Sequence, residues 1–399
     1  MPRCPTKGNR TRGQPISRRA FLGVSAGALA AWLTGCRRIA EAPTAFPSAT
    51  PPPAPSPPPF SAPLSTTPSP PPPEATPIPP TYTPVPATPT IPPPATPEPA
   101  LALNRAELMA HWPATSASRV VVVRHSGVWA GDTPDPAVVR QMLDAGISTL
   151  TDVSDVLAVW RALLDPGERV LLKVNCISYG GPTQPAVTYG VAQRLQDAGI
   201  PGENILIFDR TDNELTAAGY ALNESGAGIQ CHGSRGRGTQ AALSQASVKF
   251  YQEIDACDAI INIPTPKQHD MAGVSVALKN HYGSVDNPGA LHGNRCDPAI
   301  AELNAQPNVR DKTRLIVAAA LNVSPRDWNR PERENALLFS FDPVALDTVG
   351  RDILVRQRQA MGLDAGYLID GAHHLSTAQT LGLGATDANL IDLREVVLG

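Results

Sequence analysis

Features common in nucleic-acid-binding and metal-cluster proteins are scarce in this sequence. Aromatic residues make up 5% and charged residues 17% of the 399 residues, and the formal net charge is −3. There is no basic stripe with interleaved aromatic side chains, so nucleic acid is not an expected partner. The six cysteines include no C-x-x-C pair, so neither a zinc ribbon nor a ferredoxin-type cluster is supported by spacing.

Phosphate-binding fingerprints and internal repeats are also missing. The Gly-rich stretch KVNCISYGGPTQP (173–185) lacks the Gly-Lys-Ser/Thr of a Walker loop, and it is not a GxGxxG segment.

Four thiols lie beyond residue 100, and in an exported domain they allow one or two disulfides whose pairing the sequence does not define. Cys257, inside IDACDAIINI, is interpreted as a small buried apolar residue.

The apolar run near the N-terminus is too short to span a membrane. It covers about 14 residues, 20–33, whereas a stable transmembrane helix needs about 20. The arginine pair Arg18-Arg19, followed by Phe21-Leu22, resembles a twin-arginine export signal. Leu-Thr-Gly-Cys at 33–36 resembles a lipoprotein cleavage box with Cys36 as the acylated residue. An uncleaved membrane anchor is the alternative, and it implies the same location.

These patterns predict a signal peptide over residues 1–36, with the twin-arginine translocase as the partner during export. Diacylglycerol on Cys36 would anchor the chain durably, because two acyl chains give stable membrane binding, whereas binding through one acyl chain is reversible. We therefore expect a protein at the outer face of the cytoplasmic membrane or the cell surface. Since the twin-arginine route carries folded chains, the signal also favours a cofactor loaded before export.

A proline-rich stretch follows the signal. Residues 41–100 contain 26 of the 44 prolines, and each fixes its φ angle and removes a backbone donor, so neither helix nor sheet is expected. We predict a disordered, polyproline II-like linker over residues 37–100, with an upper-limit reach of roughly 190 Å. It is interpreted as a stalk between membrane and domain; a ligand for proline-binding modules is the alternative.

Residues 101–399 have the pattern of one α/β domain. Short β-branched runs alternate with helical segments, which favours a mostly parallel sheet with helices on both faces. Strands are expected at 119–125, 169–175, 204–210, 258–264, 314–321 and 337–341, and helices at 136–146, 155–164, 185–199, 272–280 and 342–357. Segment 222–250 is rich in Gly, Ser and Gln, and its structure is left open.

Polar residues follow three of the predicted strands. Ligands of open α/β sheets bind outside the carboxyl ends of parallel strands, so these residues are candidates for binding an anionic cofactor or substrate. For Asp209 the sequence leaves two roles open, that of a site residue and that of a structural residue. Asp342 is interpreted as a helix cap. For Asp347 it leaves two positions open, facing water at the edge of the core or facing the crevice. The candidate binding residues are Lys173, Asn175, Thr183, Asp209, Lys267 and Asn280.

His269 and Lys279 are the strongest catalytic candidates. A lysine held in a partly apolar cleft has a lowered pKa and becomes nucleophilic, and a nearby histidine is a natural acid, base or metal ligand. His292 and His281 are the candidate metal ligands. The alternative is that Lys279 extends to solvent and the histidines are surface residues.

The blocks KVN…GG…TQP, DAIINIPTPKQHDMAGVSVALKNHYG (258–283) and FDPVALDTVGRDIL (341–354) together resemble the family known as domain of unknown function 362. The resemblance extends over about 120–399. Many members of that family carry an appended ferredoxin-like cysteine cluster. This chain has no such cluster, so iron–sulfur electron transfer is not implied.

A second resemblance is chemically more specific. HDMAGVSVALK (269–279) is similar to the H-x-x-A-G-x-S-x-x-x-K segment of nickel-pincer lactate racemases. This implies that Lys279 would carry a metal-pincer cofactor covalently, that His269 would transfer protons, and that His292 would ligate the metal. The N-terminal arginine–proline phosphate motif of the racemases is not found here.

Together, the sequence predicts a membrane-tethered extracytoplasmic α/β protein that binds an anionic cofactor or metal in a Lys/His crevice. Proton-transfer or redox chemistry is expected there. The alternative is a non-enzymatic solute-binding lipoprotein in which the same crevice captures a small anion. The substrate and the metal are not defined by the sequence.

Overall fold

The computed structural model describes residues 103–109, 117–177, 181–327 and 330–399. The predicted signal, the proline-rich linker and Cys36 lie outside these residues, so the expectations about them stay predictions. No helix in the described part of the chain is both long and apolar enough to cross a membrane.

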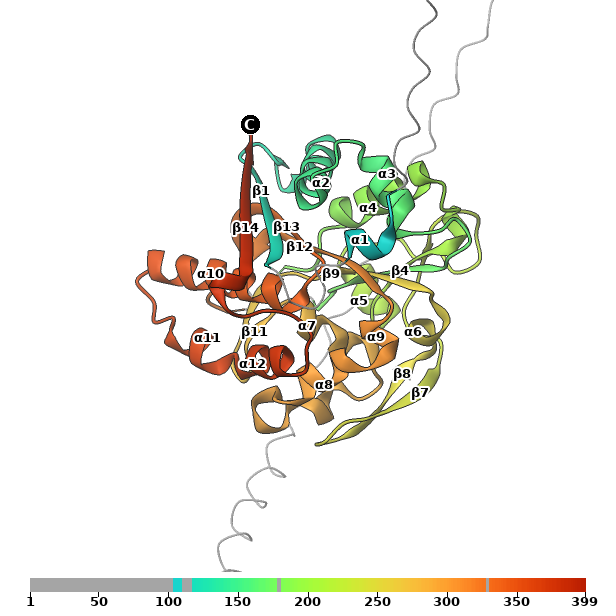
Figure 1. Cartoon of the computed structure of the whole chain (residues 1–399). Helices are drawn as coiled ribbons and strands as arrows, with labels where there is room; N and C mark the ends of the chain where they lie inside the picture. Colours follow the sequence, from blue (N-terminus) through green and yellow to red (C-terminus); the bar gives the residue numbers. More distant parts are fainter. Residues whose placement is uncertain (1–102, 110–116, 178–180, 328–329) are drawn as a thin grey trace, which may run out of the picture. The chain divides into compact units, whose positions relative to one another are not determined.

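One mixed sheet forms the centre of the domain (Figure 1). Its order is β14-β1-β13-β12-β9-β4-β5-β6. β13 is antiparallel to both of its neighbours, and the other pairs are parallel. The predicted mostly parallel sheet is therefore confirmed. The strands are β1 Ser118–His125, β4 Val170–Val174, β5 Ile205–Phe208, β6 Gln230–Cys231, β9 Ala259–Ile263, β12 Thr313–Val323, β13 Glu332–Ser340 and β14 Ile391–Leu398.

Helices cover both faces of the sheet, and alternate side chains of each strand therefore pack into two different cores. Val121 and Val123 pack with α2 (Pro136–Thr151), α3 (Val156–Leu163) and α4 (Pro185–Ala198). Val120 and Val122 belong to the core of the opposite face, with α8 (Ala299–Ala305), α10 (Pro343–Ala360) and α12 (His373–Thr380). Figure 1 shows α2, α3 and α4 in green on one side of the sheet and α8, α10 and α12 on the other.

The longer helices begin where the sequence places caps. The Asp342 carboxylate accepts from the backbone N–H groups of Val344 and Ala345, with Pro343 in the first turn, so its predicted capping role is confirmed. Asp135 caps α2 in the same way. α4 ends at Gly199, whose φ of 107° is in the left-handed region that suits glycine.

The remaining elements are short. Segment 222–250 contains β6 and the hairpin β7–β8, and four cysteines of the described residues, at 176, 231, 257 and 296, are free and buried. Cys257 is thus buried as predicted. The other bounds are α1 Arg105–Leu108, β2 Trp129–Ala130, β3 Thr133–Pro134, α5 Asp212–Ala217, β7 Arg237–Ala242, β8 Ser247–Tyr251, α6 Gln252–Ala256, α9 Pro307–Arg310 and α11 Gly366–Gly371, and the 3-10 turns η1 Gly202–Asn204, η2 His281–Ser284, η3 Pro288–Cys296 and η4 Ala388–Leu390.

The predicted helix at 272–280 is wrong. The segment forms a hairpin of β10 (Lys267–His269) and β11 (Gly273–Ser275), and only α7 (Ala277–Asn280) is helical. Gly273 has a φ of 69°, which is strained for any other residue, and a Cβ there would lie 2.8 Å from the Ala372 nitrogen. Tertiary contact with the α11–α12 turn therefore overrides the helical pattern.

Candidate functional site

A cavity of about 240 Å³ lies at the carboxyl ends of β4, β5 and β9. This is the edge of the sheet where three strand ends were expected to bring polar residues together. The lining includes both catalytic candidates and four of the binding candidates. It consists of Asn175, Ile177, Asp209, Arg210, Glu214, Lys267, His269, Ser275, Lys279, Asn280, Tyr282, Gly283, Pro288 and His292.

Lys279 enters the cavity from α7. Its Nζ lies 4.3 Å from the centroid of the Tyr282 ring, and the residue is 8% exposed. Burial lowers the pKa of Lys279 to about 8. The start of α7 is held by Asp347 of α10, which accepts from the backbone N–H groups of Ala277 (2.6 Å) and Leu278 (3.1 Å). Asp347 therefore lies in the core and fixes the backbone that presents Lys279.

Lys267 enters from β10 and is held by hydrogen bonds. Its Nζ donates to Asn175 Oδ1 at 2.6 Å and to the Ile177 carbonyl at 3.3 Å. Burial lowers the pKa of Lys267 to about 8, while the charge of Asp209 opposes that shift. The Lys267 ammonium and the Asn175 amide therefore form one polar patch on the cavity wall.

His269 is held in one proton arrangement by its own hairpin. Its Nδ1 accepts from the backbone N–H groups of Met271 (3.2 Å) and Ala272 (3.1 Å). Burial, and next the charge of Lys279, lower the pKa of His269 to about 3, so the ring is neutral at neutral pH. Because Nδ1 is an acceptor, the proton of the neutral ring is on Nε2. His269 is thus a hydrogen-bond donor through Nε2.

His292, on η3, has the opposite arrangement. Its Nδ1 lies 2.9 Å from the Pro288 carbonyl, which only accepts, so Nδ1 carries the proton and Nε2 carries the lone pair. The rings of His269 and His292 are stacked with centroids 5.7 Å apart, and Tyr282 meets His292 edge-on at 5.3 Å. Burial lowers the pKa of His292 as well. The cavity therefore has one neutral imidazole donor beside one neutral imidazole acceptor.

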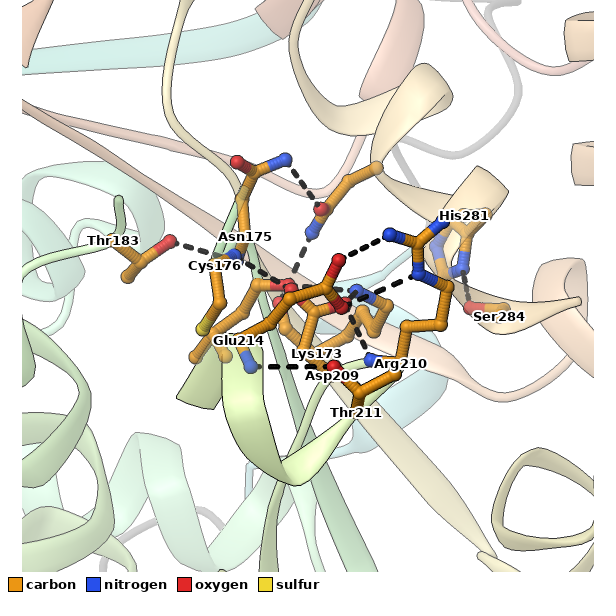
Figure 2. Close-up of polar contacts among 12 residues, drawn as sticks. Lys173, Asn175, Cys176, Thr183, Asp209, Arg210, Thr211, Glu214, His281 and Ser284 are labelled. Atoms are coloured by element: carbon orange, nitrogen blue, oxygen red, sulfur yellow. Dashed lines mark hydrogen bonds and ion pairs between the residues drawn. The ribbon is translucent and has the colours of Figure 1, made fainter. Parts of the chain in front are cut away.

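Lys173 and Asp209 form a buried ion pair beneath the cavity (Figure 2). Lys173 Nζ lies 2.8 Å from Asp209 Oδ1, and the side chains are 1% and 5% exposed. The carboxylate also accepts from the backbone N–H groups of Cys176 and Arg210. A Cβ on Gly283 would lie 2.8 Å from Lys173 Nζ, so the turn after α7 packs directly on this pair. The structure brings Asp209 to the cavity wall but not Lys173.

Thr183 and Asn280 connect the strand ends to each other. Thr183 Oγ1 donates to the Ile263 carbonyl and accepts from the Asn175 N–H, so it ties the Gly-rich loop to β9 and does not line the cavity. Asn280 lines the cavity, and its Nδ2 donates to the Lys173 carbonyl at 3.1 Å. Asn280 Oδ1 accepts from Asn175 Nδ2 at 3.3 Å.

His281 does not join the other site candidates. It is 1% exposed, and its Nδ1 lies 3.1 Å from Ser284 Oγ (Figure 2). Asn262 Nδ2 donates to its Nε2 at 3.3 Å. His281 follows Lys279 by two positions in the chain, and a step of two residues along a helix rotates the side-chain direction by about 200°. Within the described ranges, no three His, Cys, Asp or Glu side chains are grouped as a metal ion would require. The assignment of His292 or His281 as a metal ligand stays a prediction.

Some residues near the cavity were not predicted as site residues. Tyr282 directly follows the Lys279–His281 segment, and Arg210 directly follows Asp209. Their position next to predicted site residues in the sequence was the signal that could have identified them. Arg210 is paired with Glu214 (Figure 2), which raises its pKa. His374 is fully buried, burial and Lys279 lower its pKa to about 3, and neither ring nitrogen has a partner in the described part of the chain. No local sequence pattern pointed to His374.

The part of the chain that contains this site is similar to a known family model. Residues 170–352 match the model of Domain of unknown function (DUF362). A thylakoid-associated protein of Synechocystis sp. is 28% identical over 236 residues, which are 54% of this chain and 72% of that protein.

Two solved structures are similar at low identity. The lactate racemase apoprotein of Thermoanaerobacterium thermosaccharolyticum is 13% identical with a TM-score of 0.31, and the match covers 56% of this chain and 54% of that one. A protein of Thermotoga maritima is 12% identical with a TM-score of 0.30, over 63% of this chain and 60% of that one. This chain thus spans just over half of the racemase chain. The residues that match the DUF362 model, 170–352, include Lys173, Asp209, His269 and Lys279.

Proposed function

We propose that the cavity binds a small anionic ligand and transfers protons on it. The observation that carries this proposal is the opposite proton arrangement of His269 and His292 beside a buried lysine amine. A donor and an acceptor that face the same space are what general acid–base catalysis requires. Lys267 and Asn175 supply the cationic patch for a carboxylate or phosphate.

The size of the cavity favours a small ligand. Its volume of about 240 Å³ equals about eight water volumes in the liquid, and it is below the usual range for drug-sized ligands. A metal held by protein side chains alone does not fit the donors of the described residues. We therefore derive no step through a metal or a pincer cofactor, and we assign the chemistry to the lysines and imidazoles.

The test uses pyruvate, a small carboxylate with exchangeable C–H groups, and the Lys279→Arg variant. We expect the full chain to accelerate methyl-proton exchange of pyruvate in D₂O, followed by NMR. Lys279→Arg keeps a positive charge but loses the amine base, so exchange should fall by about 10²-fold or more. The control is Lys249→Arg, because Lys249 is exposed on β8. This variant should accelerate the proton exchange of pyruvate as much as the unchanged chain does.

Pyruvate that binds without any accelerated exchange would favour simple anion capture, which is the solute-binding alternative. Absence of binding by pyruvate, lactate and phosphate would contradict the proposed anion site altogether.

We also propose that the domain is tethered to the outer face of the membrane through acylated Cys36, with residues 37–100 as the stalk. Cys36→Ala removes the acceptor thiol, so the protein should lose incorporated palmitate label and move from the membrane to the soluble extracytoplasmic fraction. Cys4→Ala, in the basic region of the signal, is the matched control and should stay membrane-bound. A Cys36→Ala protein that still pellets with membranes after an alkaline wash would contradict lipid anchoring.

A further inference from the structure

Three lysines at this end of the sheet are buried, and their amines differ in what they contact. Lys173 Nζ is paired with Asp209 and donates to the Val174 carbonyl at 2.7 Å. Lys267 Nζ donates to Asn175 and to a backbone carbonyl. Lys279 Nζ contacts the face of the Tyr282 ring, and among the residues that the structure describes it makes no hydrogen bond.

An amine without a hydrogen-bond acceptor is a better nucleophile when it also loses its proton easily. With a pKa of about 8 for Lys279, about one molecule in ten has the free amine at pH 7, against fewer than about one in a thousand for an ordinary lysine. The amine lies at the wall of the cavity, so a ligand bound there can reach it. Lys279 thus has both properties that a carbonyl-attacking lysine needs.

We propose that Lys279 forms an imine with the carbonyl carbon of a small 2-oxo acid bound in the cavity. The proposal rests on the proposed anion site, and it names the class of ligand and the covalent step. The Nζ lone pair attacks the carbonyl carbon, and the carbonyl oxygen takes up a proton. The nitrogen then loses a proton to His292, the hydroxyl group takes up that proton and leaves as water, and a protonated imine remains. In sum, one amine, one carbonyl group and one proton from solvent give one protonated imine and one water, so no oxidant or reductant is needed.

Each neighbour has a role that follows from its geometry. The Nε2–H of His269 donates to the carbonyl oxygen, and the Nε2 lone pair of His292 accepts the proton that the nitrogen gives up. Lys267 holds the carboxylate, because it enters the same cavity as a cation. The Tyr282 ring lies against Nζ at 4.3 Å, so its π face stabilises the positive charge of both the ammonium and the imine.

A protonated imine also explains why proton transfer would occur in this cavity. It withdraws electrons from the adjacent carbon and so makes a C–H bond next to it more acidic than in the free 2-oxo acid. A neutral imidazole acceptor beside it then suffices as the base. The covalent step and the proton-transfer step therefore use the same set of side chains.

The experiment is reductive trapping on the full chain. Incubation with pyruvate and sodium borohydride reduces an imine to a stable secondary amine, which intact-mass spectrometry detects and peptide mapping locates. We expect one adduct per chain, on Lys279 and not on Lys267 or Lys249. Propionate, which has no carbonyl carbon to attack, should compete for the site and give no adduct. In Lys279→Arg the adduct should disappear while propionate still binds.

The outcomes separate this inference from the proposed function. Binding of pyruvate and propionate without any trapped adduct would overturn the imine and leave the anion site in place. An adduct on Lys267, or equal trapping in Lys279→Arg, would also overturn it. If neither acid binds, by calorimetry and by ligand-detected NMR, both the anion site and the imine are contradicted.

Discussion

Asp209→Asn is expected to lower the free energy of unfolding by about 3–5 kcal/mol. The change leaves the Lys173 ammonium buried without a negative partner, with only the Val174 carbonyl and the neutral amide oxygen as hydrogen-bond acceptors. It also places an amide group where two backbone N–H groups, of Cys176 and Arg210, now donate to a carboxylate. Urea unfolding followed by circular dichroism measures the loss.

The reverse change should be milder. Lys173→Met leaves the carboxylate with two backbone donors at 2.6 and 2.9 Å, so we expect a loss nearer the lower end of that range. Lys173→Met combined with Asp209→Asn removes both charges and should be less destabilised than Asp209→Asn alone. A loss below about 1 kcal/mol for Asp209→Asn would contradict the ion pair as a main support of the strand ends.

The strand ends were predictable because buried parallel strands have a strong local signal. The runs around Lys173, Asp209 and Pro264 are apolar and β-branched, and their carboxyl ends must meet at one edge of the sheet. The meeting of Lys267, His269 and Lys279 in one cavity follows from this topology. The sequence therefore contained enough information to indicate where a site would lie.

Side-chain direction was less predictable, because it depends on contacts between distant segments. The hairpin at 267–275 arises where Gly273 meets the α11–α12 turn, a contact across about 100 residues. That hairpin, with its turn, sets the proton arrangement of His269. His281 points away from Lys279 only because α7 is a single turn that continues as a 3-10 turn. No local pattern distinguishes Lys173, which is paired, from Lys279, which has no ion-pair partner among the described residues.

Paired and unpaired lysines should therefore respond oppositely to the same substitution. Lys279→Met is expected to raise the free energy of unfolding by roughly 1–3 kcal/mol at pH 7. The physical reason is that burial lowers the pKa of Lys279 from 10.5 to about 8, so folding must desolvate a charge that has no carboxylate partner within residues 103–109, 117–177, 181–327 and 330–399. The contact with Tyr282 offsets part of this cost.

The pH dependence identifies the cause. Between pH 8 and pH 10.5 the unfolded chain holds a proton on Lys279 that the folded chain has lost, so the stability of the unchanged protein rises with pH in this window. The advantage of Lys279→Met should accordingly be constant below pH 8 and shrink towards zero by about pH 10.5. Because other groups titrate in both proteins, their contributions cancel in the difference.

Lys249→Met is the matched control, since Lys249 is exposed on β8, and it should change stability by less than about 0.5 kcal/mol at any pH in the window. Lys279→Met should also abolish trapping by borohydride. If Lys279→Met is more stable but forms no imine adduct, Lys279 lowers the stability of the fold and is needed for the reaction. Destabilisation by Lys279→Met at pH 7, or a difference that does not change with pH, would contradict that interpretation and point to Lys279 as a packing residue.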